Sequence, residues 1–451
     1  MSAPHSTDLY GAHLPGPPAR PAELDGGGIK SAERHAGAQG RGLNHAYSAP
    51  KPATIADTAP QANAAPGPAE FSPHQDRAML EWSRLRPDDG LVFGVTLRLK
   101  GPRPTAEQVA ALVTARLPLL PALAERLDGP PGHEFWRADT AYDARRHVHL
   151  HGPAVDPTVC AQDLGNQPLG EDGPRWGLWL GDGGEGEFLL SYRVHHAAQD
   201  GVAAAYTLKR LFDARALPTG QPRPDTDPGT ATSAPASTTT SAPGRLLVAA
   251  DVPLEATRVI SRGTGASLND VYLAALAGAL RAWLPPAERD QPVPVRVPFS
   301  VRLRHERQDR GNRLGYTRLF LPVDEPKPAH RLTQVAQATA DWPRERTRKL
   351  LDRMPHHLLW RHIAASLTPG DSLASATLLS IPTPLAFNGH PVIAGTAMPP
   401  LAAGHLFSSV LFRHRAGATL SFTAREQHQH VTDLPDLWRR AVIELAAATC
   451  P

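Results

Sequence analysis

The sequence predicts an α/β fold in which strands and helices are mixed in both halves of the chain. Stretches such as residues 90–100 and 187–196 alternate apolar side chains with the period of two that a strand requires. Residues 201–214 and 266–284 instead repeat apolar side chains at helical spacing. A stretch rich in Pro, Thr, Ser and Ala, residues 219–244, separates the two halves and has the composition of a linker.

In the first half, the clearest helix start is at Thr105, because Thr105 and Gln108 have capping-box spacing. The Gly-rich segment GDGGEGE, residues 181–187, is predicted to join two strands as a hairpin loop. The expected elements of this half are therefore a strand at 90–100, a helix at 105–117, strands at 175–182 and 187–196, and a helix at 201–214.

The second half opens with the most regular helical pattern of the chain, residues 266–284. Residues 408–424 are predicted as two strands that turn at Ala416 and Gly417. The remaining expected elements of this half are a strand at 292–303 and a closing amphipathic helix at 433–448.

Composition predicts four segments. Residues 1–70 are rich in Pro, Gly and Ala without apolar periodicity, which is typical of a disordered extension. The expected organisation then continues with an N-terminal lobe at 71–216, a flexible linker at 217–245 and a C-terminal lobe at 246–451.

Charge and cysteine content exclude several classes of protein. The 47 Lys and Arg residues are nearly balanced by 44 Asp and Glu residues, so nucleic-acid binding is not expected. Two cysteines, Cys160 and Cys450, are too few for a disulfide framework or a cysteine-based zinc site. No secretory signal pattern is visible, and the apolar run 271–284 is too short to span a membrane. We therefore expect a cytoplasmic protein without a metal or other cofactor.

The stretch HHAAQDG, residues 195–201, is the main candidate for chemistry. On an extended strand, His196 continues the apolar row of side chains and His195 points to the other face, so the pair is a poor metal clamp. Two other interpretations remain open: His196 is a packed core histidine, or it is a general base. Asp200 has the position of a helix N-cap before Gly201. No GxSxG, P-loop or GxGxxG motif offers different chemistry.

HHAAQDG resembles the HHxxxDG signature of acyltransferases with the chloramphenicol acetyltransferase-like fold, which include peptide-synthetase condensation domains. Further segments are similar, in order and spacing, to the bacterial wax ester synthase/diacylglycerol acyltransferase family. Arg175 replaces a Leu of the family pattern, and SIPTP (380–384) stands where the family has SNVPG. The similar segments are FSPHQDRAML (71–80), PRWGLWL (174–180), LNDVYLAALAGALRAWL (268–284), VPFSVRLR (297–304) and GNRLGYTRLFLPVD (311–324).

The resemblance implies two lobes, each with a mixed sheet and flanking helices, and an active-site tunnel at their interface. It implies that His196 is the general base, with His195 and Asp200 in the same motif, and that Asp200 pairs with Arg302. Gly201 is expected to serve close packing or a turn, and Asn269 to donate a hydrogen bond near the reaction. Asp270 has a competing interpretation, because Ser267 and Asp270 have capping-box spacing.

Three functions follow as hypotheses. The first is transfer of an acyl group from CoA to a lipid alcohol, giving a wax ester or triacylglycerol. The second is transfer from CoA or an acyl-carrier protein to the hydroxyl or amine of a specialised metabolite. The third is a non-catalytic docking module. For the enzymes, the expected partners are an acyl thioester donor and an alcohol or amine acceptor, with a carrier protein and peripheral contact with a membrane or lipid droplets as further expectations.

Overall fold

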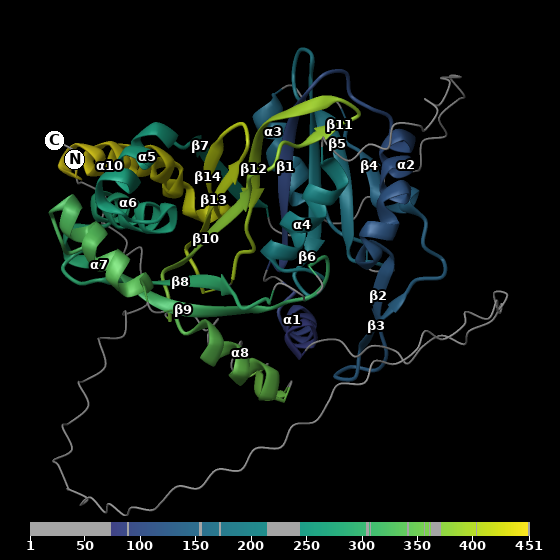
Figure 1. Cartoon of the computed structure of the whole chain (residues 1–451), viewed down its shortest axis with the longest axis horizontal. Coiled ribbons are helices and arrows are strands. Elements are labelled where there is room, and N and C mark those ends of the chain that lie inside the picture. Colours follow the sequence, from purple (N-terminus) through teal and green to yellow (C-terminus); the bar gives the residue numbers. More distant parts are fainter. Residues whose placement is uncertain are drawn as a thin grey trace, which may run out of the picture. The chain divides into compact units, whose positions relative to one another are not determined.

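In the part of the chain that the structure describes, two six-stranded mixed sheets carry the helices (Figure 1). The predicted N-terminal extension, residues 1–70, lies outside the described residues, as does the predicted linker at 217–245 except for Gly244 and Arg245. The structure is a computed structural model, and it describes residues 74–87, 90–152, 156–170, 173–213, 244–303, 306, 308–340, 342–355, 357–359, 361, 371–402 and 404–449, all within one compact unit.

The first sheet is completed by strands from the C-terminal half of the chain. β12 (His390–Met398) pairs antiparallel with β1 (Val92–Lys100), and β1 pairs on its other side with β6 (Glu187–His195) (Figure 1). Residues 386–398 of the predicted C-terminal lobe therefore lie in the sheet of the N-terminal lobe, where β12 satisfies the hydrogen-bonding groups of β1. The strand order is β11 (Ala386–Phe387), β12, β1, β6, β5 (Trp176–Asp182) and β4 (Val148–Leu150).

The second sheet is built from the rest of the C-terminal half. β10, which is among the strands that were not predicted from the sequence, lies near its centre and pairs in parallel with both of its neighbours. The strand order is β7 (Arg245–Asp251), β14 (Ala418–Arg425), β13 (Phe407–His414), β10 (Ala374–Ile381), β8 (Val293–Ser300) and β9 (Leu314–Leu321). A separate hairpin joins β2 (Glu125–Asp128) to β3 (Phe135–Ala138).

Helices cover both sheets. On the first sheet, α2 and α4 pack on one face and α3 on the other, so β6 is buried on both sides. On the second sheet, α6 and α10 contribute to a core with one face of the strands. The helices are α1 (His74–Leu85), α2 (Ala106–Arg116), α3 (Pro157–Asn166), α4 (Gly201–Phe212), α5 (Leu254–Thr264), α6 (Leu268–Trp283), α7 (Pro328–Ala340), α8 (Arg344–Arg353) and α10 (Leu434–Thr449).

One of the two large hydrophobic cores contains side chains from both sheets. The side chains of β10 alternate between these cores: Ala374 and Ala376 belong to the core of α6, whereas Leu379 and Ile381 pack with β1, β6 and α4. β13 alternates in the same way. The second sheet thus lies between its own helices and the first sheet, which places α4 and the end of β6 at the boundary between the two sheets.

The expected elements are found at the predicted positions, with ends that differ by a few residues. The capping box at Thr105 is present: its side chain accepts from the Gln108 backbone, and the Gln108 side chain accepts from the Thr105 backbone. None of the described helices is long and apolar enough to cross a membrane.

Candidate active site

The two histidines of HHAAQDG have different surroundings. His195 is the last residue of β6 and is buried, whereas His196 follows the strand and lines an apolar cavity of about 340 Å³ between the two sheets. The His196 backbone N–H donates to the Leu91 carbonyl at 2.9 Å, and the ring lies 5.1 Å from that of Phe93. Strand parity therefore identified the histidine that reaches the cavity.

Asn312 determines which nitrogen of His196 carries the proton. The Asn312 side-chain NH₂ donates to the carboxylate of Asp76 at 2.9 Å and to the His196 carbonyl at 2.7 Å, so its Oδ1 is an acceptor. His196 Nδ1 lies 2.9 Å from this Oδ1 and is therefore the protonated nitrogen. Nε2 is therefore the unprotonated nitrogen, and its lone pair can accept a proton, as a general base requires.

Asp76 of α1 holds Asn312 in turn. Its carboxylate accepts from the Asn312 backbone at 2.7 Å and from the Trp136 indole at 3.0 Å, in addition to the Asn312 amide. Burial raises the pKa of Asp76 to about 6, and the hydrogen bonds from Trp136 and Asn312 act in the opposite direction. Neutral pH therefore keeps Asp76 ionised and able to accept all three hydrogen bonds.

His195 has a structural environment. Its Nδ1 accepts from the Ala197 backbone at 3.1 Å, so Nε2 carries the proton and donates to the Ser83 hydroxyl at 2.9 Å. Burial, with the charge of Arg175 and the neighbouring His196, lowers the pKa of His195 to about 3. The ring is therefore neutral, and both of its nitrogens are used to join the β6–α4 turn to α1.

Asp200 is both the helix cap and the ion-pair partner that were considered from the sequence. Its Oδ1 accepts from the Ala203 backbone at 2.9 Å, which caps α4. Its Oδ2 lies 2.9 Å from Arg302 Nη2, and the side chains are only 3% and 4% exposed. The implied Asp200–Arg302 contact is therefore present, and it is buried.

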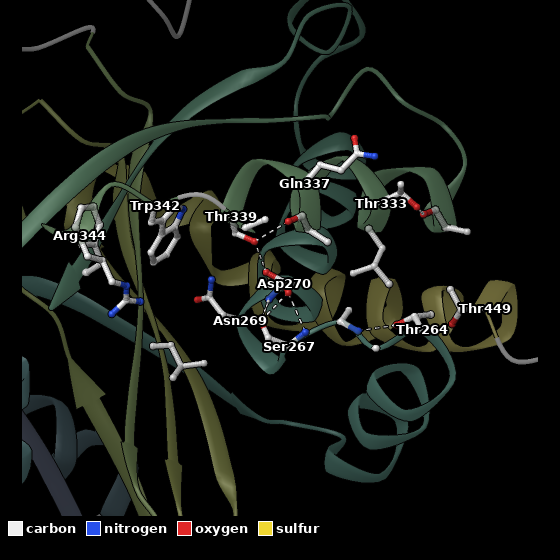
Figure 2. A pocket seen from close by; sticks show the side chains of 18 of the residues that line it. Thr264, Ser267, Asn269, Asp270, Thr333, Gln337, Thr339, Trp342, Arg344 and Thr449 are labelled. Atoms are coloured by element: carbon white, nitrogen blue, oxygen red, sulfur yellow. Dashed lines mark hydrogen bonds between the residues drawn. The ribbon is translucent and has the colours of Figure 1, made fainter. Parts of the chain in front are cut away.

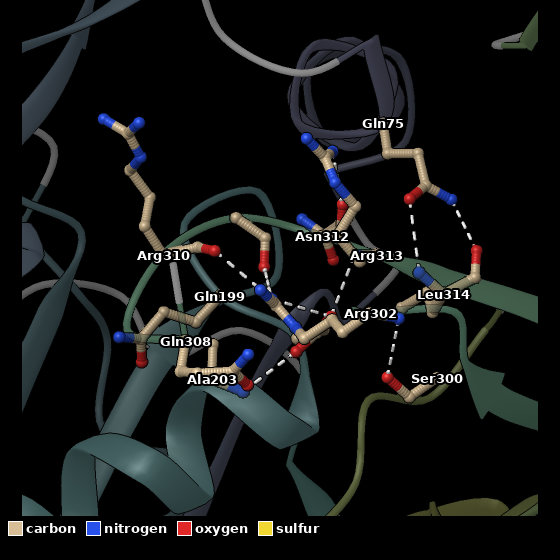
Figure 3. Close-up of polar contacts among 12 residues, drawn as sticks. Gln75, Gln199, Ala203, Ser300, Arg302, Gln308, Arg310, Asn312, Arg313 and Leu314 are labelled. Carbon is tan, nitrogen blue, oxygen red and sulfur yellow. Dashed lines mark hydrogen bonds and ion pairs between the residues drawn. The ribbon is translucent and has the colours of Figure 1, made fainter. Parts of the chain in front are cut away.

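Arg302 also fixes the loop that carries Asn312. Figure 3 shows its guanidinium among backbone carbonyls, and Nη2 donates to those of Arg310 and Gly311 at 3.2 and 2.5 Å. The Arg313 backbone N–H donates to Asp200 Oδ2 at 2.9 Å. The ion pair thus ties the β6–α4 turn to this loop and holds Asn312 against His196.

Gly201 is the first residue of α4 and lines the cavity. A Cβ at this position would meet only Leu379, at 3.7 Å, which is ordinary van der Waals contact. The close packing that was expected of Gly201 is not found, and its backbone is not in the left-handed region. The missing side chain instead leaves space in the cavity beside His196.

A second cavity of about 1150 Å³ adjoins the first and contains the remaining predicted residues. Asp270 forms the capping box with Ser267, and its other oxygen accepts from Thr339 at 2.6 Å (Figure 2). The cap interpretation of Asp270 is therefore confirmed. Asn269 lines this second cavity and not the one that contains His196. Residues that line both cavities are Val202, Pro298, Phe299, Ser300 and Leu378.

Sequence comparison shows which proteins this chain is similar to. Residues 90–246, which include the histidine pair, match the wax ester synthase/diacylglycerol acyltransferase catalytic domain. The predicted family resemblance is confirmed. The chain is 28% identical over 266 residues to a putative diacylglycerol O-acyltransferase of Mycobacterium tuberculosis, which covers 45% of this chain and 52% of that relative. A probable diacylglycerol O-acyltransferase of the same organism is 25% identical over 291 residues, covering 52% and 63%. The chain thus matches about half the length of such relatives.

Solved structures agree on the fold. The wax ester synthase/diacylglycerol acyltransferase of Marinobacter aquaeolei VT8 superposes with a TM-score of 0.58 at 16% identity, covering 84% of this chain and all of that one. The first condensation domain of the CDA synthetase gives 0.60 at 19% identity, covering 85% and 98%. The expected two-lobed α/β fold is therefore confirmed.

Two residues of this family-like site were not predicted. Asp76 and Asn312 lie in the segments 71–80 and 311–324, which were recognised as family-like but were given no role. Among the described residues, no group of three or more His, Cys, Asp or Glu side chains could hold a metal ion. Hydrogen bonds from Asp76 through Asn312 converge on the imidazole of His196.

Proposed function

We propose that this protein transfers an acyl group from a thioester to the hydroxyl or amine of an acceptor, with His196 as the general base. The observation that carries the proposal is the state of this imidazole. Its Nδ1 is engaged by Asn312, and the ring lines an apolar cavity at the boundary of the two sheets. His195, by contrast, has both of its nitrogens engaged.

The reaction needs no covalent intermediate with the protein. His196 Nε2 accepts the proton of the acceptor O–H as the oxygen attacks the thioester carbonyl. The C–O bond forms, the C–S bond breaks, and the imidazolium returns the proton to the leaving thiolate. Acyl-CoA or an acyl-carrier protein is a co-substrate in this scheme, and no cofactor is required.

Burial lowers the pKa of His196, while the charge of Asp200 and the hydrogen bond to Asn312 act to raise it. The base is therefore neutral at pH 7 and ready to accept a proton. General-base catalysis contributes about 10²–10⁴-fold. We assign the rest of the rate enhancement to the positioning of donor and acceptor in the two adjoining cavities.

The names of similar proteins support two substrate classes. Diacylglycerol O-acyltransferases support a lipid alcohol as acceptor, for which contact with a membrane surface or lipid droplet from the cytoplasm is part of the proposal. Structural neighbours also include a starter condensation domain in complex with C8-CoA. This supports the second candidate, acylation of a specialised metabolite.

The function is tested by incubating the purified full chain with a panel of acyl-CoAs, alcohols, a diacylglycerol and amines. We expect one acylated acceptor for each CoA released, measured by mass spectrometry of the product and by thiol titration. Release of CoA with only free fatty acid would identify a thioesterase instead. An absence of CoA release with every pair, and with acyl-carrier protein as donor, would contradict the proposed activity.

Replacing Asn312 tests how the base is positioned. Asn312→Leu removes the acceptor that holds His196 Nδ1, so we expect kcat to fall by about 10–100-fold. The hydrogen bond that His196 donates to Asn312 raises the pKa of His196. Its loss should therefore move the acid limb of the kcat/KM profile to lower pH, because the imidazolium becomes less stable.

A matched control is available on the same loop. The Gln75 side chain donates to the Leu314 carbonyl at 2.5 Å and accepts from the Leu314 backbone at 3.2 Å, so it steadies the loop from α1. Gln75→Leu should lower stability and leave the acid limb in place. Identical pH profiles for Asn312→Leu and the unmodified protein would show that Asn312 does not act through His196.

A further inference from the structure

The cavity beside His196 also contains a buried guanidinium. Arg296 of β8 lines this cavity and is only 7% exposed. Within the described ranges, no other Lys or Arg lines the cavity. Its Nη2 lies 3.4 Å from Asp371, whereas Nη1 has no hydrogen-bond partner among the described residues. Arg296 therefore has N–H groups available for a ligand.

A second polar side chain lines the same cavity. His405, in the segment between β12 and β13, is 6% exposed, and its Nδ1 has no hydrogen-bond partner in the described part of the chain. Burial and the positive charge of Arg296 lower the pKa of His405 to about 3, so the ring is neutral. A neutral imidazole donates one hydrogen bond and accepts another. Arg296 and His405 thus leave unused polar atoms in a largely apolar space.

The charge of Arg296 is incompletely balanced. Asp371 also accepts from Arg318 at 2.9 Å, so two guanidiniums share one carboxylate, and Arg296 is the more distant of the two. A buried charge is stable when it is paired. A carboxylate matches a guanidinium in charge and in planar geometry. A dianionic phosphate is a poorer match, because the described lining residues provide no second Lys or Arg.

We propose that Arg296 and His405 bind a carboxylate of one substrate inside the cavity of His196. The preferred substrate is then an acid with an aliphatic body, and not a fully neutral lipid. The carboxylate belongs either to the acceptor, as in a hydroxy acid, or to the acyl chain, as in the mono-thioester of a dicarboxylic acid. A neutral substrate would leave Nη1 of this buried guanidinium without a hydrogen-bond acceptor, which is a basis for discrimination. This inference rests on the proposed acyl transfer.

The experiment compares two matched pairs of substrates by kcat/KM with the full chain. The acceptor pair is an n-alkanol and the ω-hydroxy acid of equal length. The donor pair is an alkanoyl-CoA and the ω-carboxyalkanoyl-CoA of equal length. We expect at least about tenfold preference for the carboxylate member of one pair, and the pair that shows it identifies the source. Arg296→Met should reduce that preference to about twofold or less.

Arg318→Met is the matched comparison, because Arg318 shares Asp371 with Arg296 but does not line the cavity. It leaves Asp371 to Arg296 alone, which weakens the preference, but Nη1 of Arg296 stays without a partner in the part of the chain that the structure describes, so more of the preference should survive than in Arg296→Met. His405→Leu should weaken the preference and serves as a second variant if Arg296→Met fails to fold. Equal kcat/KM within both pairs, or an unchanged preference in Arg296→Met, would overturn the inference while leaving acyl transfer established.

Binding gives a readout that does not depend on turnover. Isothermal titration with a fatty acid and the corresponding alcohol should show tighter binding of the acid, and Arg296→Met should remove the difference. If no substrate pair is turned over but this difference is found, the carboxylate site stands and the proposed activity fails. If the acid and the alcohol bind equally, the carboxylate site is wrong whatever the activity.

Discussion

His196→Ala is expected to lower acyl transfer by about 10²-fold or more while the fold persists. The side chain lines a cavity, and its Nδ1 hydrogen bond goes to one partner, Asn312, which keeps its bonds to Asp76. Truncation therefore removes the base and disturbs little packing. Turnover should be measured together with the melting temperature and with binding of the acyl donor, both of which should remain near those of the unmodified protein.

His195→Ala is the matched control and should show the opposite result. It removes two buried hydrogen bonds, to Ser83 and to the Ala197 backbone, at about 0.5–1.5 kcal/mol each. We expect a lower melting temperature and much more activity per folded molecule than in His196→Ala. Equal loss of activity in both variants would remove the distinction between them, and an active His196→Ala protein would exclude His196 as the base.

Asp200→Ala and Arg302→Ala should each destabilise the protein strongly. Each leaves a buried charge without its partner, at about 3–5 kcal/mol, and Asp200→Ala also removes a helix cap worth about 1 kcal/mol. The double variant should lose less free energy of unfolding than the sum of the two single variants. Chemical denaturation of the four proteins measures this coupling.

Arg310→Ala supplies the comparison for that cycle. Arg310 lies on the same loop and is also largely buried, but its side chain pairs with Glu125 at 3.1 Å. The loss of unfolding free energy in Arg310→Ala should add to the loss in Asp200→Ala within about 0.5 kcal/mol. If the effects of Asp200→Ala and Arg302→Ala on the free energy of unfolding were equally additive, the ion pair would contribute no coupling energy. The hydrogen bond from the Ala203 backbone, which caps α4, would then account for the role of Asp200.

The features that the sequence predicted correctly are those that depend on residues close together in the chain. The capping boxes at Thr105 and Ser267 and the alternation in β6 are set within a few positions of the chain, and all are found. The position of His196 follows from the same alternation. Asp200 and Arg302 are distant in sequence, and their pairing came from the family resemblance alone.

The parts that were not predicted depend on contacts across the chain. Asp76 and Asn312 are separated by 236 positions, and neither an Asp nor an Asn has a local pattern that indicates its partner. The same applies to β12, because alternation indicates a strand but not the sheet that it joins. Asn269 was expected near the base, yet it lines the second cavity together with its neighbours Ser267 and Asp270.

The pairing of β12 with β1 has a consequence for synthesis on the ribosome. The strand that covers β1 is completed only at Met398, about 300 residues after β1 has been made. Until then the nascent N-terminal half presents the unpaired edge of β1, which is a template for pairing with other chains. Cutting the gene between the two halves would leave the same edge of β1 exposed in the first product. The two halves are therefore parts of one folding unit.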